Sequence, residues 1–345
     1  MSTKTVPPPG PVHPELAQLL AQGAEVMTID GSIDIHQMRA KLTARKRALT
    51  AAVGGAQVPA NVKEKDIQVP SRDSGRTITC RVHAPIPDAT PKEGSPLFVM
   101  FHGGGFCLGG LENEELQSRL FAQEGVTVLN VDYRLAPEHP FPAAAEDAWD
   151  VVKWAAAHVS ELNVNPKQGF MAGGISAGGN LAAVVGHLAG DEKLDPPLTG
   201  LYLSIPTLIG SAGADIVPER YKGIYTSPAQ NAHPPGMGAE GMRFFREQYR
   251  PDLKSPFSGP LAWPTGHANL PPTYFQIAEL DPLRDDAVIF ERMLREEEGI
   301  DTKQDFYPGL PHGFWSAFPT AAFSKQVPKD GVVGLKWLLE KGRKT

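Results

Sequence analysis

The segment from Met171 to Asn180 constrains this chain more than any other, because it contains the pentapeptide Gly174-Ile-Ser-Ala-Gly178. An apolar run leads into the pentapeptide, and small residues at helical spacing follow it as far as Leu188. A strand, a sharp turn and a helix in this order hold the central serine, Ser176, above the edge of a sheet. The pentapeptide alone is a weak signal, since glycine and serine are common. The rest of the chain must therefore supply the partners of a reactive serine.

Strand patterns and helix patterns alternate along most of the chain. We expect strands at 63–69, 76–84, 96–101, 126–131, 169–172, 200–205, 273–278 and 303–307. We expect helices at 15–27, 36–51, 112–124, 143–159, 180–188, 239–249, 284–298 and 331–341. The first two strands form an antiparallel hairpin, and the continuous apolar run of the third is typical of a strand buried on both faces. The alternation predicts an α/β fold with a mostly parallel central sheet and helices on both faces.

Two segments do not follow this alternation. The two N-terminal helices precede every strand, and residues 207–270 are rich in proline, glycine and aromatic residues. The second segment is too long for an ordinary connection between strands. We therefore expect an N-terminal arm and cap helices at 1–55, a catalytic domain at 56–206 and 271–345, and a cap insertion at 207–270.

Two polar residues follow late strands and complete a candidate catalytic set. Asp281 follows the strand at 273–278, and His312 follows the strand at 303–307. Loops at the carboxyl ends of parallel strands meet at one edge of a sheet, where ligands bind. A serine nucleophile needs a base to take its proton and an acid to orient that base. We therefore predict Ser176 as nucleophile, His312 as base and Asp281 as orienting acid.

Other acidic residues compete with Asp281 for the role of orienting acid. Glu279, Asp285 and Asp286 lie in the same loop and the following turn. Asp285 could instead stabilise the start of the next helix, where a negative charge is favourable. The chain has ten histidines, and the position after the last strand selects His312 among them.

The glycine-rich run 102–105 follows the third strand and is the candidate oxyanion loop. Backbone N–H groups there must point to the place where negative charge develops on the attacked carbonyl. We predict the amides of Gly103, Gly104 and Ala177 as the donors. We expect His102 to fix this loop through side-chain hydrogen bonds rather than to take part in catalysis.

Three residues near these motifs have structural interpretations. Arg134 and Glu138, in the loop 133–142, could form a buried ion pair. Cys107, close to the glycine run, is expected to behave as a small apolar residue.

Composition excludes several classes of function. The formal net charge of −6 and the absence of a Lys/Arg-rich block argue against a nucleic-acid partner. Two cysteines encode no disulfide framework, and no Cys/His pairs stand at zinc spacing. No apolar run approaches the length of a membrane span, and the N-terminus lacks the order of a signal peptide. We therefore expect a cytoplasmic protein without a cofactor or a metal.

Taken together, these motifs resemble those of the hormone-sensitive-lipase-like family of α/β-hydrolases. The matching stretches stand in the family's order, at 102–106, 132–142, 176–180, 281–285 and 312–314. The resemblance implies the α/β-hydrolase fold with a helical cap over the active site that shapes substrate choice, and self-association, for example as a homodimer. One departure is Ile175, where many members have an acidic residue, and it leaves the subfamily and the local hydrogen bonding open.

The sequence therefore predicts a serine carboxylesterase that hydrolyses small-molecule esters with short to medium acyl chains through an acyl-enzyme. The same triad could serve an acyltransferase, a lactonase or an ester hydrolase of specialised metabolism. A remote alternative is a non-catalytic small-molecule receptor, since the family includes plant hormone receptors. Those receptors depart from the family at the histidine, whereas His312 is present here. A scaffolding protein would not need an intact triad.

Overall fold

A single sheet organises the molecule. The computed structural model describes residues 9–24, 26, 29, 34–52 and 57–343, so the first eight residues of the expected arm lie outside the described part. The sheet has eight strands in the order β1-β2-β4-β3-β5-β6-β7-β8. Their bounds are Val62–Pro70, Thr77–Pro85, Leu97–Phe101, Thr127–Val131, Phe170–Ile175, Gly200–Ser204, Thr273–Ala278 and Thr302–Tyr307, from β1 to β8.

The strand directions agree with the expected pattern. β2 pairs antiparallel with both β1 and β4, and every other neighbouring pair is parallel. Every residue of β3, β4, β6 and β7 is buried, because helices cover both faces of the sheet there. The mostly parallel α/β sheet predicted from the alternation is confirmed.

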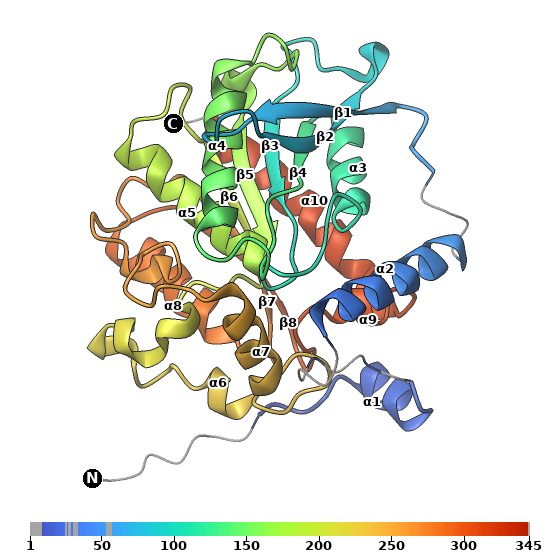
Figure 1. Cartoon of the computed structure of the whole chain (residues 1–345), viewed down its shortest axis with the longest axis vertical. Coiled ribbons are helices and arrows are strands. Elements are labelled where there is room, and N and C mark those ends of the chain that lie inside the picture. The colour runs from blue at the N-terminus through green and yellow to red at the C-terminus, as the bar shows by residue number, and fades with distance from the viewer. Residues whose placement is uncertain (1–8, 25, 27–28, 30–33, 53–56, 344–345) are drawn as a thin grey trace.

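The helices divide between the two faces of the sheet. They are α1 Pro14–Ala21, α2 Ile35–Ala52, α3 Glu115–Gln123, α4 Ala143–Ala157, α5 Ala177–Asp191, α6 Ser227–Gln230, α7 Ala239–Tyr249, α8 Arg284–Arg292, α9 Phe314–Ala317 and α10 Ala322–Gly342. α3 and α10 pack together against one face, and α4, α5 and α8 cover the other (Figure 1). α1, α2, α6 and α7 gather at the carboxyl end of the parallel strands, in the lower half of the view.

The structure differs from the sequence-based expectation at several helix boundaries and in two short helices. α10 begins at Ala322 rather than near residue 331, although Pro328 lies inside it. Proline usually ends a helix, but here Phe323 and Val327 in the first half of α10 are buried in a cluster with Phe314, which holds that half in place. The expected helix at 284–298 ends as a π-helical turn after Arg292. The short helices α6 and α9 were not expected, because four residues are too few to show a period.

The N-terminal helices contribute to the core although they precede the sheet. Leu16 of α1 is fully buried in the cluster around Phe314, and Ile35 and Met38 of α2 are buried in the main core. A Cβ placed on Gly241 of α7 would lie 2.8 Å from the carbonyl oxygen of Ile29, so the N-terminal segment touches the insertion at 207–270. The division of the chain into a catalytic domain and two cap segments stays a prediction.

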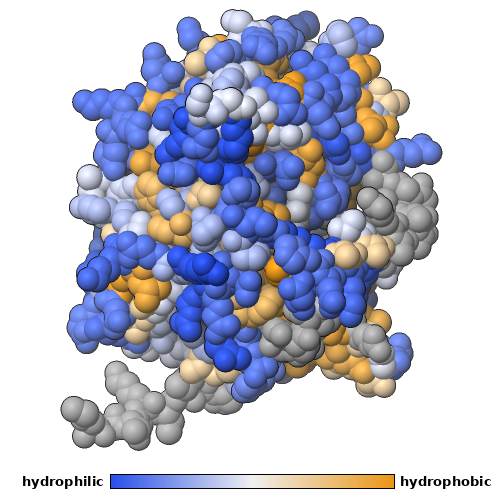
Figure 2. All heavy atoms as spheres, in the orientation of Figure 1, coloured by the Kyte–Doolittle hydropathy of each residue, from blue (hydrophilic) through white to orange (hydrophobic). Residues whose placement is uncertain are grey.

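The surface carries mixed character. The face in Figure 2 is mostly hydrophilic, with apolar residues scattered in small groups. No helix in the described part of the chain has both the length and the apolar character that a membrane crossing requires.

Candidate active site

The turn between β5 and α5 holds Ser176 in an unusual backbone conformation. Its φ of 56° and ψ of −112° lie outside the regions that residues with a side chain prefer. A Cβ on Gly174 would lie 2.4 Å from backbone atoms of Gly178, and one on Gly178 would lie 2.0 Å from the carbonyl oxygen of Phe101. Both flanking positions therefore need glycine for space, and the turn lifts the serine hydroxyl above the carboxyl end of the sheet.

The three predicted side chains form one hydrogen-bonded series. Nε2 of His312 lies 2.9 Å from Oγ of Ser176, and Nδ1 of His312 lies 2.6 Å from Oδ2 of Asp281. Ser176 is 8% exposed and Asp281 is 1% exposed, so little water screens the series. The amide of Leu283 donates to Oδ1 of Asp281 at 2.7 Å, which fixes the second oxygen of the carboxylate. The arrangement has the geometry of a nucleophile, a base and an orienting acid.

The competing acidic residues bind elsewhere. Oδ2 of Asp285 accepts the amides at the start of α6, those of Thr226 and Ser227, each at 2.6 Å. Oδ2 of Asp286 accepts the amides of residues 208–210, at 2.9 to 3.4 Å, and so holds the loop after β6. Oε2 of Glu279 accepts the amide of Gly309 at 2.7 Å. Each of these carboxylates fastens a loop, and of the four acids only Asp281 bonds to His312.

The oxyanion loop differs from the sequence-based expectation at its first glycine. The amide of Gly103 donates to Oε1 of Glu114 at 3.3 Å, so this N–H already has a partner. The sequence did not show this, because the direction of each amide in a glycine run depends on contacts with residues outside the run. Glu114, eleven residues further along, supplies the contact here.

The next two amides of the loop are aimed by the carbonyls that share their peptide planes. The carbonyl of Gly103 accepts from the His102 ring at 2.9 Å and from Asn113 at 3.4 Å. The carbonyl of Gly104 accepts from the backbone amides of residues 107 and 108, at 3.0 and 2.9 Å. In a trans peptide the C=O and the following N–H point in opposite directions, so the N–H groups of Gly104 and Gly105 point away from these bonds. The sequence analysis did not predict Gly105 as a donor, because the three glycines at 103–105 cannot be told apart by sequence alone.

Within the described residues, the amides of Gly104, Gly105 and Ala177 make no hydrogen bond. Ala177 is the first residue of α5, and the first N–H groups of a helix have no partner inside it. These three amides are therefore available to a negatively charged oxygen above Ser176, where the positive end of the α5 dipole also favours negative charge.

His102 has the structural role expected from the sequence. Its ring stacks on Tyr133 with centroids 4.1 Å apart, and the Tyr133 hydroxyl donates to the His102 carbonyl at 2.7 Å. The expected pair of Arg134 with Glu138 is wrong. Arg134 binds the fully buried Asp147, whose carboxylate also accepts the Arg134 backbone amide at 3.0 Å.

Cys107 is buried beside this loop, as expected of a small apolar residue. Burial raises the pKa of its thiol to about 12, because desolvation disfavours the thiolate.

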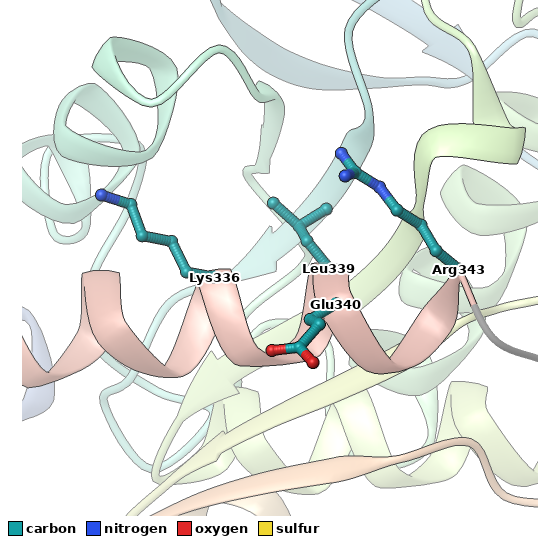
Figure 3. A pocket seen from close by; sticks show the side chains of 4 residues that line it. All are labelled: Lys336, Leu339, Glu340 and Arg343. Carbon is teal, nitrogen blue, oxygen red and sulfur yellow. The ribbon is translucent and has the colours of Figure 1, made fainter.

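A cleft of about 1020 Å³ opens above Ser176 and His312. Its apolar wall comes from segments far apart in the chain, namely Val26, Ile29, Leu42, Met237, Phe245, Trp315 and Phe318. A second, smaller hollow lies on the outer surface of α10, where Lys336, Glu340 and Arg343 extend from the helix (Figure 3). It lies apart from the triad. In the part of the chain that the structure describes, no three His, Cys, Asp or Glu side chains are grouped to hold a metal.

Comparison with known proteins agrees with this geometry. Residues 98–316 match the family model described as alpha/beta hydrolase fold, which covers more than half of the chain. The chain belongs to the α/β-hydrolase family. The resemblance to the hormone-sensitive-lipase-like branch is confirmed by relatives and structural neighbours that are named esterases.

Three similar proteins illustrate the range of this α/β-hydrolase family. An AB hydrolase superfamily protein of Schizosaccharomyces pombe is 38% identical over 96% of this chain and 95% of its own length. Versiconal hemiacetal acetate esterase of Dothistroma septosporum is 37% identical over 72% of this chain and 75% of its own length. The crystal structure of vibralactone cyclase superposes with a TM-score of 0.85 and 29% identity, and covers 96% of both chains.

Proposed function

We propose that this α/β-hydrolase is a serine carboxylesterase that works through an acyl-enzyme. The observation that carries the proposal is the hydrogen-bonded series from Ser176 through His312 to the buried Asp281. The esterase names among the relatives support the same reaction class. A receptor or a scaffold would not need this series, and the aligned His312 speaks against both.

The proposed reaction has two halves, and in each half His312 acts first as a base and then as an acid. Oγ of Ser176 attacks the ester carbonyl carbon while Nε2 of His312 takes the hydroxyl proton. Asp281 holds the imidazole in the required tautomer and stabilises the imidazolium. His312 then gives the proton to the leaving alkoxide, and the acyl-enzyme remains. A water molecule, deprotonated by His312, attacks the acyl carbon. His312 then returns this proton to Oγ of Ser176 as the carboxylic acid leaves, which restores the free enzyme.

The tetrahedral intermediate carries a negative oxygen, which we assign to the amides of Gly104, Gly105 and Ala177. Because Gly103 already donates to Glu114, it leaves the set of donors that the sequence predicted. Each such donor is worth roughly 100- to 1000-fold in turnover. The start of α5 adds the favourable field of its dipole.

The proposed substrates are esters with short to medium acyl chains, and the apolar wall of the cleft supports binding of an apolar acyl group. A panel of p-nitrophenyl esters graded by acyl length tests the function directly. We expect turnover to be highest with acyl chains of short to medium length. Absence of turnover across the whole panel, in folded protein, would contradict the proposal.

One comparison favours a second candidate, which is acyl transfer inside one molecule or to an acceptor other than water. The neighbour with the TM-score of 0.85 is named a cyclase rather than an esterase. The same acyl-enzyme could pass its acyl group to an alcohol in place of water. Product analysis with and without an added alcohol separates the two, because transfer yields a new ester and hydrolysis yields the free acid.

A further inference from the structure

Arg39 of α2 reaches from the N-terminal segment to the loops that support the oxyanion loop. Its Nε donates to the carbonyl of Cys107 at 2.7 Å, and its Nη2 donates to the carbonyl of Ala136 at 2.6 Å. The same guanidinium donates to both carboxylate oxygens of Glu138, at 2.5 and 2.8 Å. One side chain therefore holds two backbone carbonyls and one carboxylate, which uses the planar fork of donors that only arginine has.

The Cys107 carbonyl belongs to the turn that aims an oxyanion donor. The amides of Cys107 and Leu108 both donate to the Gly104 carbonyl, and this fixes the direction of the Gly105 N–H. Arg39 binds the carbonyl of Cys107, and the amide of Cys107 binds the carbonyl of Gly104. Cys107 therefore links Arg39 to Gly104. A shift of Cys107 would change both the Gly104 contact and the aim of the Gly105 amide.

The position of Arg39 depends on how α2 packs. Ile35 and Met38, one turn before Arg39 and beside it, are 3% and 1% exposed. The same helix also lines the cleft with Arg39 and Leu42. α2 therefore contributes to the wall that meets the substrate and, through Arg39, to the support of the loop that meets the oxyanion.

We propose that Arg39 is a positioning residue that couples the packing of α2 over the cleft to the alignment of the Gly105 amide. The proposal rests on the proposed function, because it assigns a role in the same reaction. Arg39 acts through Cys107 and the turn, and does not itself bind the reacting atoms.

The partner carboxylate is not the main element of this coupling. The Glu138 side chain is 41% exposed, and ion pairs at such exposure contribute little to stability. The hydrogen bond from Arg39 lowers the pKa of Glu138 to about 2, so the carboxylate is charged at neutral pH and keeps the guanidinium oriented. The two carbonyl contacts carry the positional effect.

The test compares three variants by steady-state kinetics on one short-chain p-nitrophenyl ester. In Arg39→Met the carbonyl contacts are lost, and we expect kcat to fall about 10- to 100-fold with KM changed less than about threefold, because misplaced donors weaken transition-state stabilisation. Glu138→Gln keeps the donors on the two carbonyls and should retain kcat within about threefold.

Arg81→Met is the matched control for loss of a forked arginine pair. Arg81 is 26% exposed against 23% for Arg39, and it donates to both oxygens of Asp66 at 2.7 and 3.0 Å and to Oε1 of Glu115 at 2.6 Å. Neither partner belongs to the oxyanion loop or to the turn at residues 104–108. Its loss should leave kcat unchanged. Equal kcat in the Arg39→Met and Arg81→Met proteins would overturn the proposal.

A second readout separates positioning from general loosening of the fold. A trifluoromethyl ketone forms a tetrahedral adduct whose oxygen occupies the oxyanion position. We expect its affinity for Arg39→Met to fall in parallel with kcat/KM, while the affinity for the acid product stays within about threefold, since only the adduct uses the donors. A parallel loss for both ligands would contradict the proposal.

Two outcomes remain to be distinguished. If the wild-type protein has no esterase activity, the proposed function fails, whatever Arg39 does. If Arg39→Met does not fold, Arg39→Lys provides the same comparison, because it keeps the charge and the long stem but cannot reach all three acceptors. Wild-type kcat in Arg39→Lys would then refute the positioning role.

Discussion

The carboxylate of Asp281 is held from both sides, with Oδ2 lying 2.6 Å from Nδ1 of His312 and Oδ1 accepting the Leu283 amide at 2.7 Å. The carbonyl of Asp281 also accepts from Asn231 at 2.9 Å. The acid therefore has little freedom to turn away from the imidazole. The contact between Oδ2 of Asp281 and Nδ1 of His312 places the ring N–H on Nδ1 and leaves the lone pair of Nε2 facing Ser176.

Replacement of Asp281 by asparagine should remove this control over the imidazole. The amide can donate to Nδ1 and favour the wrong tautomer, and we expect kcat to fall by about 10⁴-fold, as in other serine triads. Steady-state kinetics on a short-chain ester provide the measurement. Asp285→Asn is the comparison, because Asp285 lies on the same turn but binds the start of α6. A larger loss in Asp285→Asn than in Asp281→Asn would contradict the assignment of the acid.

Asp147 should be one of the most important polar residues for stability. It is fully buried and binds two arginines, Arg76 and Arg134. Asp147→Ala removes the buried partner of both arginines and leaves them only the more exposed carboxylates of Asp73 and Glu146. We expect the free energy of unfolding to fall by about 3 kcal/mol, the lower end of the range for breaking a buried ion pair. Asp66→Ala removes a carboxylate that is 45% exposed, and should cost about 1 kcal/mol or less. Urea unfolding of both variants measures the difference, and similar losses would refute the role given to Asp147.

Stability should also fall in mild acid because of a buried histidine pair. Nε2 of His187 lies 2.9 Å from Nδ1 of His267, against Trp263 and Phe290. Burial lowers the pKa of both imidazoles, that of His187 to about 3. Below pH about 6.5 these two histidines bind protons in the unfolded chain but stay neutral in the folded protein. The contribution of the pair to the free energy of unfolding is therefore complete above pH about 6.5 and is lost as the pH falls toward 3.

The variant His187→Gln isolates this effect from the other titrating groups. Each proton that is taken up only on unfolding lowers the free energy of unfolding by up to about 1.4 kcal/mol per pH unit. We expect the unfolding free energy of the wild type to fall more steeply between pH 7 and 5 than that of His187→Gln, although the variant is less stable at pH 7. Urea unfolding at a series of pH values is the measurement. Equal slopes would show that the pair is not the cause.

The triad could be predicted from the sequence because strand order determines it. Ser176, Asp281 and His312 each follow a strand of a parallel sheet, and parallel strands end at a common edge. β5 and β7 were recognisable because helices bury both of their faces, which makes their runs mostly apolar. β8 is a partly exposed edge strand, and the alternation of strands and helices indicated its position. The positions of the strands in the sequence were therefore enough to predict that the three triad residues meet at one edge of the sheet.

The remaining features depend on contacts between distant segments. The direction of the Gly103 amide is set by Glu114, and the partner of Glu138 is Arg39, 99 residues earlier in the chain. Neither contact leaves a period or a motif in the sequence. The path of α10 through Pro328 likewise depends on the buried cluster around Phe314, which no local pattern reveals.

The central claim is that Ser176 is the nucleophile of an ester hydrolase, and covalent labelling tests it most directly. A fluorophosphonate reacts with an activated serine, and intact-mass analysis followed by peptide mapping locates the adduct. We predict a single adduct on Ser176 in the wild type, and neither adduct nor ester turnover in Ser176→Ala with an unchanged circular dichroism spectrum. An adduct on another residue, or wild-type turnover in Ser176→Ala, would contradict the account.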